Sequence, residues 1–185
     1  MRNELAYPGQ LRASLWRWAL VLAPGLLLLG VLSGAFAGSG AGNPWFAALE
    51  KPPLYPPPAL FGIAWSVLYV LMGLALAMIV TARGARTRRA ALIAFAIQFA
   101  LNLVWSPLFF AAHQITLALI VLAVLDFAVV LTIILFHAVR PVAALILLPY
   151  LAWILFATVL NWQFLTYNPG ADGQENSGAV TRVQL

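Results

Sequence analysis

The sequence has no cysteine, only two histidines and few charged residues. Without cysteine the chain can form no disulfide, no thiolate nucleophile and no cysteine-ligated metal site. Two histidines argue against a histidine metal cluster as well. Charged residues make up 8% of the 185 residues, whereas soluble domains carry about a quarter, so an ordinary soluble domain is excluded.

What remains is apolar: 64% of the residues are hydrophobic and the mean hydropathy is +0.96. Several long apolar runs exceed the ~20 residues that a helix needs to cross a bilayer. The first run is also too long for a signal peptide, whose apolar part has about 7 to 15 residues. We therefore predict an all-α integral membrane protein, a five-transmembrane-helix bundle. The predicted helices cover about residues 15–37, 59–80, 90–112, 114–137 and 142–164.

The chain is predicted to have one membrane domain, residues 15–166, between an N-terminal tail at 1–14 and a polar, disordered tail at 167–185. Its longest connection is the loop 38–58, and loops of this length are uncommon unless they are functional. Prolines crowd the second half of the loop and predict an extended strap that ends where the next helix begins.

Basic residues are distributed unevenly over the predicted topology. Eight of the ten lie near the N-terminus or in the second-to-third and fourth-to-fifth connections, which share one side of the membrane. Lys51 and Arg182 lie on the other side. By the positive-inside rule the N-terminus is cytoplasmic and the C-terminus lies on the opposite face. Topology thus accounts for the net charge of +5, which gives no reason to expect nucleic-acid binding.

The third predicted helix carries a polar stripe. Gln98, Asn102 and Ser106 are spaced four apart, with Trp105 beside them. Lipid does not host such a stripe, so the stripe faces the bundle. Two interpretations stay open: the side chains join helices by hydrogen bonds worth ~0.6 to 2 kcal/mol each, or they meet a polar group of a ligand.

Aromatic residues mark two further helix faces. Trp65 and Tyr69 are four residues apart on the second helix, and Trp153, Ala157 and Asn161 follow the same spacing on the fifth. The small side chain of Ala157 leaves a gap one turn beyond Trp153. Together the two faces predict walls for a flat apolar molecule, while a tightly packed core without a ligand remains the alternative.

Asp126 lies near the centre of the fourth predicted helix, the costliest depth for a carboxylate, at ~2.5 to 3.5 kcal/mol or more. Protonation, a hydrogen-bonded partner or a wet cavity each relieves this cost. The sequence places no basic residue at that depth. A structural role as a protonated side chain and a functional role in transport both remain open.

Motifs in order along residues 43–165 resemble the TspO/translocator protein family, the tryptophan-rich sensory proteins related to the mitochondrial peripheral benzodiazepine receptor. Any one motif is unspecific, but their combination and order are specific. The matching pieces are Trp45-Phe-x-x-Leu49-x-Lys51-Pro52, Pro56-Pro57, Trp65-x-x-Leu68-Tyr69-x-x-Met72-Gly73, Gln98-x-x-x-Asn102-x-x-Trp105-x-Pro107-x-Phe109-Phe110, and Pro149-Tyr150-x-x-Trp153-x-x-Phe156-Ala157-x-x-Leu160-Asn161.

The resemblance implies a multi-pass protein of a bacterial inner membrane, often a homodimer, with a pocket under the long loop. The implied ligands are porphyrins of the protoporphyrin IX type, with sterols and isoquinoline or benzodiazepine-type drugs as further candidates and no obligatory cofactor. Motifs and helix faces together indicate eight ligand-binding residues. They are Trp45, Trp65, Tyr69, Asn102, Trp105, Trp153, Ala157 and Asn161.

The leading functional interpretation is a membrane tetrapyrrole-binding sensor or regulator, linked to stress responses, with the ligand stacked between Trp65 and Trp153. One alternative is light-dependent porphyrin degradation, in which these indoles exchange electrons with the excited porphyrin. The sequence offers no conventional catalytic group, so any chemistry would come from the chromophore. A second alternative is porphyrin or sterol transport, favoured if Asp126 lies in a wet path. Leu54 and Ala59 replace aromatic residues that the family has in the loop, which predicts a weak grip of the loop on the ligand.

Overall fold

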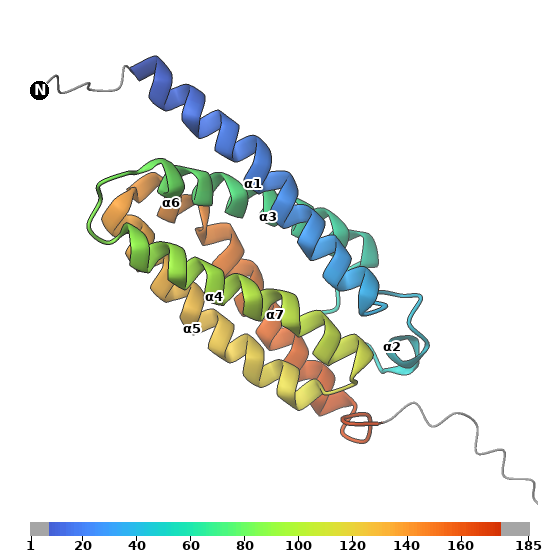
Figure 1. Cartoon of the computed structure of the whole chain (residues 1–185). Coiled ribbons are helices and arrows are strands. Elements are labelled where there is room, and N and C mark those ends of the chain that lie inside the picture. Colours follow the sequence, from blue (N-terminus) through green and yellow to red (C-terminus); the bar gives the residue numbers. More distant parts are fainter. Residues whose placement is uncertain (1–7, 175–185) are drawn as a thin grey trace, which may run out of the picture.

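The computed structural model describes residues 8–174, and within this range every regular element is helical (Figure 1). Five helical stretches of 24 to 27 residues are long and apolar enough to cross a membrane, which confirms the predicted all-α membrane fold. The long helices are α1 (Pro8–Phe36), α3 (Pro58–Thr81), α4 (Arg88–Ser106), α5 (Ile115–Val139) and α7 (Leu148–Tyr167). The short elements are α2 (Pro44–Ala48), the π-helical turn η1 (Pro107–Ala111), which continues α4, and α6 (Pro141–Ile146).

The chain differs from the predicted boundaries at three places. α1 begins at Pro8 rather than near residue 15, because hydropathy marks the membrane part of a helix and not its whole length. The last span is divided into α6 and α7 at Leu147, whose amide donates to Ala144 O at 3.1 Å. Pro149 follows in the first turn of α7, where a missing N–H is tolerated. Residues 168–174, which were predicted to be disordered, fold back against the bundle.

α1 packs along α3 through a seam that requires glycine. A Cβ on Gly73 would lie 2.6 Å from the backbone nitrogen of Ala23, so a larger side chain at this position forces the helices apart. Nearer the loop, a Cβ on Gly30 would lie 2.7 Å from the hydroxyl oxygen of Tyr69. Gly30 therefore receives a side chain of α3, whereas the N-terminal part of α1 extends beyond the bundle (Figure 1).

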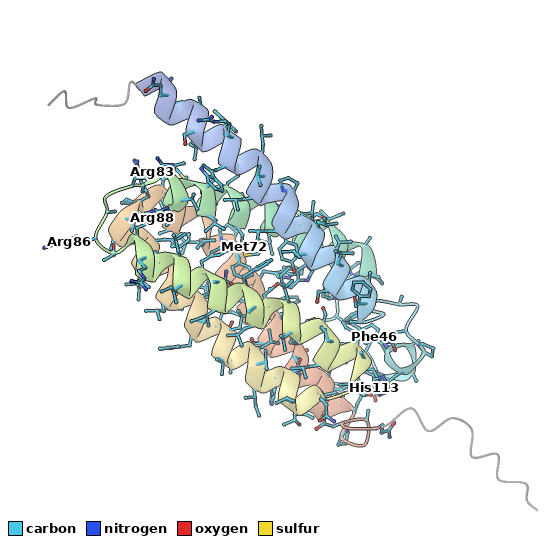
Figure 2. All side chains as sticks on the ribbon, in the orientation of Figure 1. Phe46, Met72, Arg83, Arg86, Arg88 and His113 are labelled. Atoms are coloured by element: carbon cyan, nitrogen blue, oxygen red, sulfur yellow. The ribbon has the colours of Figure 1, made fainter. Side chains whose placement is uncertain are left out.

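The two ends of the bundle differ in chemistry. Figure 2 shows Arg83, Arg86 and Arg88 at one end, and Phe46 and His113 at the opposite end. The guanidinium of Arg88 donates to two carbonyl oxygens in the last turn of α3, at 2.8 and 3.1 Å. These bonds tie the start of α4 to the end of α3, where the helix has unpaired carbonyl groups.

Apolar residues are buried in two clusters. The larger one fills the bundle and contains the fully buried side chains of Met72, Phe136 and Tyr150. The smaller one lies where α2, η1, α5 and α7 meet beneath the loop. Its buried aromatic members are Phe46, Phe109, Phe110 and Phe164. The loop therefore packs on buried aromatic side chains rather than on solvent-exposed helix ends.

Candidate functional site

A cavity of about 400 Å³ lies between the helices and the long loop, within the size range of small-molecule sites. Its lining comes from α1, α3, α4, η1, α5 and α7, with the loop above them. Seven of the eight predicted site residues line this cavity. They are Trp65, Tyr69, Asn102, Trp105, Trp153, Ala157 and Asn161.

The two predicted indoles meet at one wall of the cavity. The ring centroids of Trp65 and Trp153 are 6.4 Å apart and their planes are 86° to each other. A flat molecule therefore finds no slot between two parallel indoles, and the predicted sandwich is not the arrangement present. The wall instead offers the face of one ring and the edge of another, a geometry that aromatic rings favour.

The same wall has a second feature, an indole nitrogen with no partner. Trp153 Nε1 is buried and makes no hydrogen bond within residues 8–174. Phe61 packs edge-on against this indole at 5.9 Å, and Ala157 follows one turn along α7. A buried donor without an acceptor costs free energy, about 1 to 3 kcal/mol. The nitrogen lies inside the wall and has almost no accessible surface, so it is not presented to the open cavity.

Asn161 acts as a structural connector within the cavity wall. Its Oδ1 accepts from Trp105 Nε1 at 3.1 Å, and its Nδ2 donates to Ile115 O at 3.0 Å. Both ends of the carboxamide are thus engaged, one on α4 and one at the start of α5. Asn161 orients the Trp105 ring, which also stacks on Phe109 at 5.3 Å.

A chain of hydrogen bonds leads from the cavity into the core. Tyr69 Oη donates to Asn102 Oδ1 at 2.8 Å, and Asn102 Nδ2 donates to Tyr150 Oη at 3.2 Å. Tyr150 Oη in turn donates to Gln98 Oε1 at 2.9 Å. Tyr69 and Asn102 line the cavity, whereas Tyr150 and Gln98 are buried beyond its wall. The polar stripe of the third predicted helix thus joins helices and, at Asn102, also lines the cavity.

Tyr55 gives the loop an aromatic contact that the sequence comparison did not anticipate. Leu54 is half exposed, as its replacement of an aromatic residue suggests, but Tyr55 turns inward. Its ring lies 5.5 Å from Phe61, 5.9 Å from Phe46 and 5.8 Å from Phe164, measured between centroids. Tyr55 and Phe46 both line the cavity, so the loop presents two aromatic side chains to it despite Leu54 and Ala59.

Trp45 is the one predicted site residue that does not line the cavity. Its indole stacks on the imidazole of His113 at 4.4 Å and 18°, and it meets Phe109 edge-on at 5.6 Å. The neighbouring Phe46 occupies the cavity side of the short helix α2 instead. Trp45 therefore anchors the loop to the α4–α5 turn, a role that its motif alone does not distinguish from ligand contact.

The π-helical turn η1 supplies two lining residues that the spacing rules missed. Phe109 and Phe110 both line the cavity and are nearly fully buried. A regular α-helix would space them differently, because a π-turn inserts one residue and such turns often occur at functional sites. The available signal is Pro107, which removes a backbone donor at the start of the turn.

Residues 168–174 fasten the loop from outside the bundle. Asn168 Oδ1 accepts from Glu50 N at 2.7 Å, and Asn168 Nδ2 donates to Glu50 O at 3.0 Å. The Asp172 carboxylate accepts from the backbone and hydroxyl of Thr116, at 3.1 and 2.5 Å, in the first turn of α5. This carboxylate caps a helix that has no side-chain cap of its own.

Lys51 holds the loop at its inner edge. Its Nζ donates to Phe46 O at 2.5 Å and to Leu49 O at 2.8 Å, and it lies 4.5 Å from the centre of the Phe46 ring. Burial lowers the pKa of Lys51 from its ordinary value. Lys51 thus joins parts of the loop to one another, whereas Asn168 joins the loop to the end of α7.

Asp126 lies outside the cavity lining, at the contact between α5 and α7. Its Oδ2 is 2.8 Å from Thr158 Oγ1, which also lies 2.9 Å from Ile154 O. Thr158 thus supplies a hydrogen-bonded partner for Oδ2, whereas Oδ1 is buried and has no partner within residues 8–174. This position favours a structural role over a place in a ligand path.

Fold and cavity together define a class: an integral membrane protein whose five spanning helices enclose an aromatic cavity beneath a proline-rich loop. Within that class the chain belongs to the TspO/MBR family, whose match covers residues 20–167. It is similar to the tryptophan-rich protein TspO of Archaeoglobus fulgidus, with 40% identity over 146 residues, covering 76% of this chain and 94% of that protein. It is also similar to the human translocator protein, with 38% identity over 146 residues, covering 76% and 86%. The tryptophan-rich protein TspO of Chlorobaculum tepidum is 34% identical over 151 residues, covering 81% and 96%.

Proposed function

We propose that this protein is a tetrapyrrole-binding sensor or regulator of a membrane, with a porphyrin of the protoporphyrin IX type as its ligand. The observation that carries the proposal is the cavity wall formed by Trp65, Trp153 and the gap at Ala157. Aromatic surface of this extent suits a flat macrocycle. Binding would act on the loop, because Phe46 and Tyr55 connect it to the cavity.

Occupancy of the gap at Ala157 tests this proposal. Ala157→Phe adds a ring inside the cavity, and we expect it to abolish porphyrin binding by steric overlap, measured by quenching of tryptophan fluorescence. The matched control is Ala123→Phe, at an exposed position of α5 outside the cavity lining. Normal porphyrin affinity in Ala157→Phe would show that the ligand lies elsewhere.

Light-dependent porphyrin degradation is the second candidate, favoured by the same two indoles. An excited porphyrin would take an electron from an indole, and phenylalanine is much harder to oxidise. Trp65→Phe and Trp153→Phe keep much of the aromatic surface, so binding should weaken by only about 0.5 to 1.5 kcal/mol. If these indoles serve photochemistry, both variants lose the light-driven bleaching of the Soret band. Bleaching at the parent rate in both variants would remove this role.

Porphyrin or sterol transport is the third candidate, and the position of Asp126 outside the cavity gives it less support. Ligand flux across vesicles separates it from the other two. A sensor binds without flux in the dark or in light, a degrading protein consumes porphyrin only in light, and a transporter moves ligand in the dark.

The remaining proposals concern assembly, drugs and orientation. We propose a homodimer in a bacterial inner membrane, supported by the small exposed residues Ala96 and Ala100 on α4, and isoquinoline or benzodiazepine-type drugs as competing ligands. The arginine end of the bundle is proposed to face the cytoplasm (Figure 2). A cytoplasm-dependent reporter should be active when inserted after Gly84 and silent after residue 185. The opposite pattern would reverse the orientation.

A further inference from the structure

In the hydrogen-bonded chain from Tyr69 to Gln98, each group has a defined role as donor or acceptor. These roles decide whether Tyr69 can donate to or only accept from a ligand in the cavity. Each tyrosine hydroxyl has one hydrogen to donate. The hydrogen of Tyr150 is used on Gln98 Oε1 at 2.9 Å, so Tyr150 can meet Asn102 only as an acceptor. Asn102 therefore turns its amide nitrogen to Tyr150, at 3.2 Å, and its carbonyl oxygen to Tyr69.

The consequence appears at the cavity end of the chain. Because Asn102 presents its oxygen, Tyr69 donates its only hydroxyl hydrogen to it, at 2.8 Å. Toward the cavity, Tyr69 Oη therefore offers lone pairs and no hydrogen, so it can act there only as an acceptor. Rotation of the Tyr69 ring is blocked from the α1 side, where even a Cβ on Gly30 would lie 2.7 Å from this oxygen.

We propose that Tyr150 and Gln98, neither of which lines the cavity, act as positioning residues that keep Tyr69 a hydrogen-bond acceptor toward the ligand. The cavity thereby selects ligands that carry an N–H or O–H donor where they meet Tyr69. Tyr150 is fully buried and Gln98 is 1% exposed, so water does not compete for this chain. The inference rests on the proposed function, since it names the ligand chemistry of the same cavity.

Removing a hydrogen-bonding group at the buried end of the chain allows the donors and acceptors along it to reverse. In Tyr150→Phe the Asn102 amide loses its acceptor and can rotate, so that its nitrogen meets Tyr69 and the Tyr69 hydrogen turns to the cavity. In Gln98→Met the Tyr150 hydrogen is freed and permits the same rotation. Two substitutions outside the cavity, one retaining every group of Tyr150, should therefore have the same effect on ligand choice.

The test compares two probes: a secondary isoquinoline carboxamide with one amide N–H, and its N-methyl derivative, which lacks that donor. We expect the parent to prefer the N–H probe, and both variants to lower that preference by about fivefold, the worth of one ordinary hydrogen bond. Comparing ratios between parent and variants cancels differences between the free probes. A purely structural role would weaken both probes alike and leave the ratio unchanged. The control is Tyr167→Phe, which removes an exposed phenol at the end of α7.

An unchanged ratio in the variants, no preference in the parent, or no binding of either amide would each overturn the inference. If Tyr150→Phe fails to fold, Gln98→Met decides alone. Protoporphyrin IX is titrated into the same preparations. Loss of porphyrin binding with an intact amide preference would count against the proposed function alone, and porphyrin binding without any amide preference would count against this inference alone.

Discussion

Replacing Asn168 by alanine removes both hydrogen bonds between the end of α7 and the loop, those to the nitrogen and oxygen of Glu50 at 2.7 and 3.0 Å. The Glu50 backbone is exposed, so water replaces part of what is lost, and each bond contributes about 0.5 to 1 kcal/mol net. We expect the loop to open more easily by about 1 to 2 kcal/mol, a roughly 5- to 30-fold larger open population.

Amide hydrogen exchange at Tyr55, measured in lipid nanodiscs, reports this opening, because its N–H donates to Pro52 O within the loop and not to Asn168. Exchange should accelerate by the same factor, and porphyrin should dissociate faster, while the thermal unfolding midpoint of the bundle hardly changes. Thr166→Ala is the matched control, because its hydroxyl donates to Gln163 O in the same helix and to no loop residue in the described part of the chain. Unchanged exchange at Tyr55 in Asn168→Ala would refute the idea that the end of α7 holds the loop closed.

Two further substitutions test the packing of the bundle. Gly73→Ala should lower its stability by about 1 to 3 kcal/mol in thermal unfolding, because the new methyl group meets the Ala23 backbone, whereas Gly25→Ala, with open space around it, should not destabilise it; equal midpoints would contradict the tight α1–α3 seam. Asp126→Asn should leave stability and porphyrin affinity within about 1 kcal/mol, since the amide keeps shape and a bond to Thr158. If Asp126→Asn instead lost most of its ligand flux without unfolding, the result would favour a role of Asp126 in transport.

Patterns of local origin were predictable from the sequence. Five long apolar runs with few charges are expected to cross a bilayer as helices, because a helix satisfies its own backbone hydrogen bonds. The four-residue spacing of Trp65 and Tyr69 places both on one helix face. The start of α3 at Pro58 follows from the same rules, because the strap before it cannot be helical. These features need no knowledge of which helices are neighbours.

Features that depend on distant pairing were not predictable. Asn168 and Glu50 are 118 residues apart, and no periodicity links a tail to a loop. The aromatic face of α2 was ambiguous as well, because a five-residue helix is too short for spacing to show which of Trp45 and Phe46 turns inward. The perpendicular indoles belong to the same category, since a motif lists residue types and says nothing about ring planes.

The difference between the two ends of the bundle explains how a ligand could signal without unfolding the protein. At the arginine end, Arg88 joins consecutive helices directly and the apolar core follows. At the other end, the cavity is closed by side chains of the loop. The loop is held by exposed hydrogen bonds to Asn168, by the stacking of Trp45 on His113 and by the buried ring of Phe46. Exposed bonds break at low cost, whereas a packed core does not deform gradually. On the proposed function, we therefore expect ligand occupancy to shift the loop, through Phe46 and Tyr55, before it disturbs any transmembrane helix.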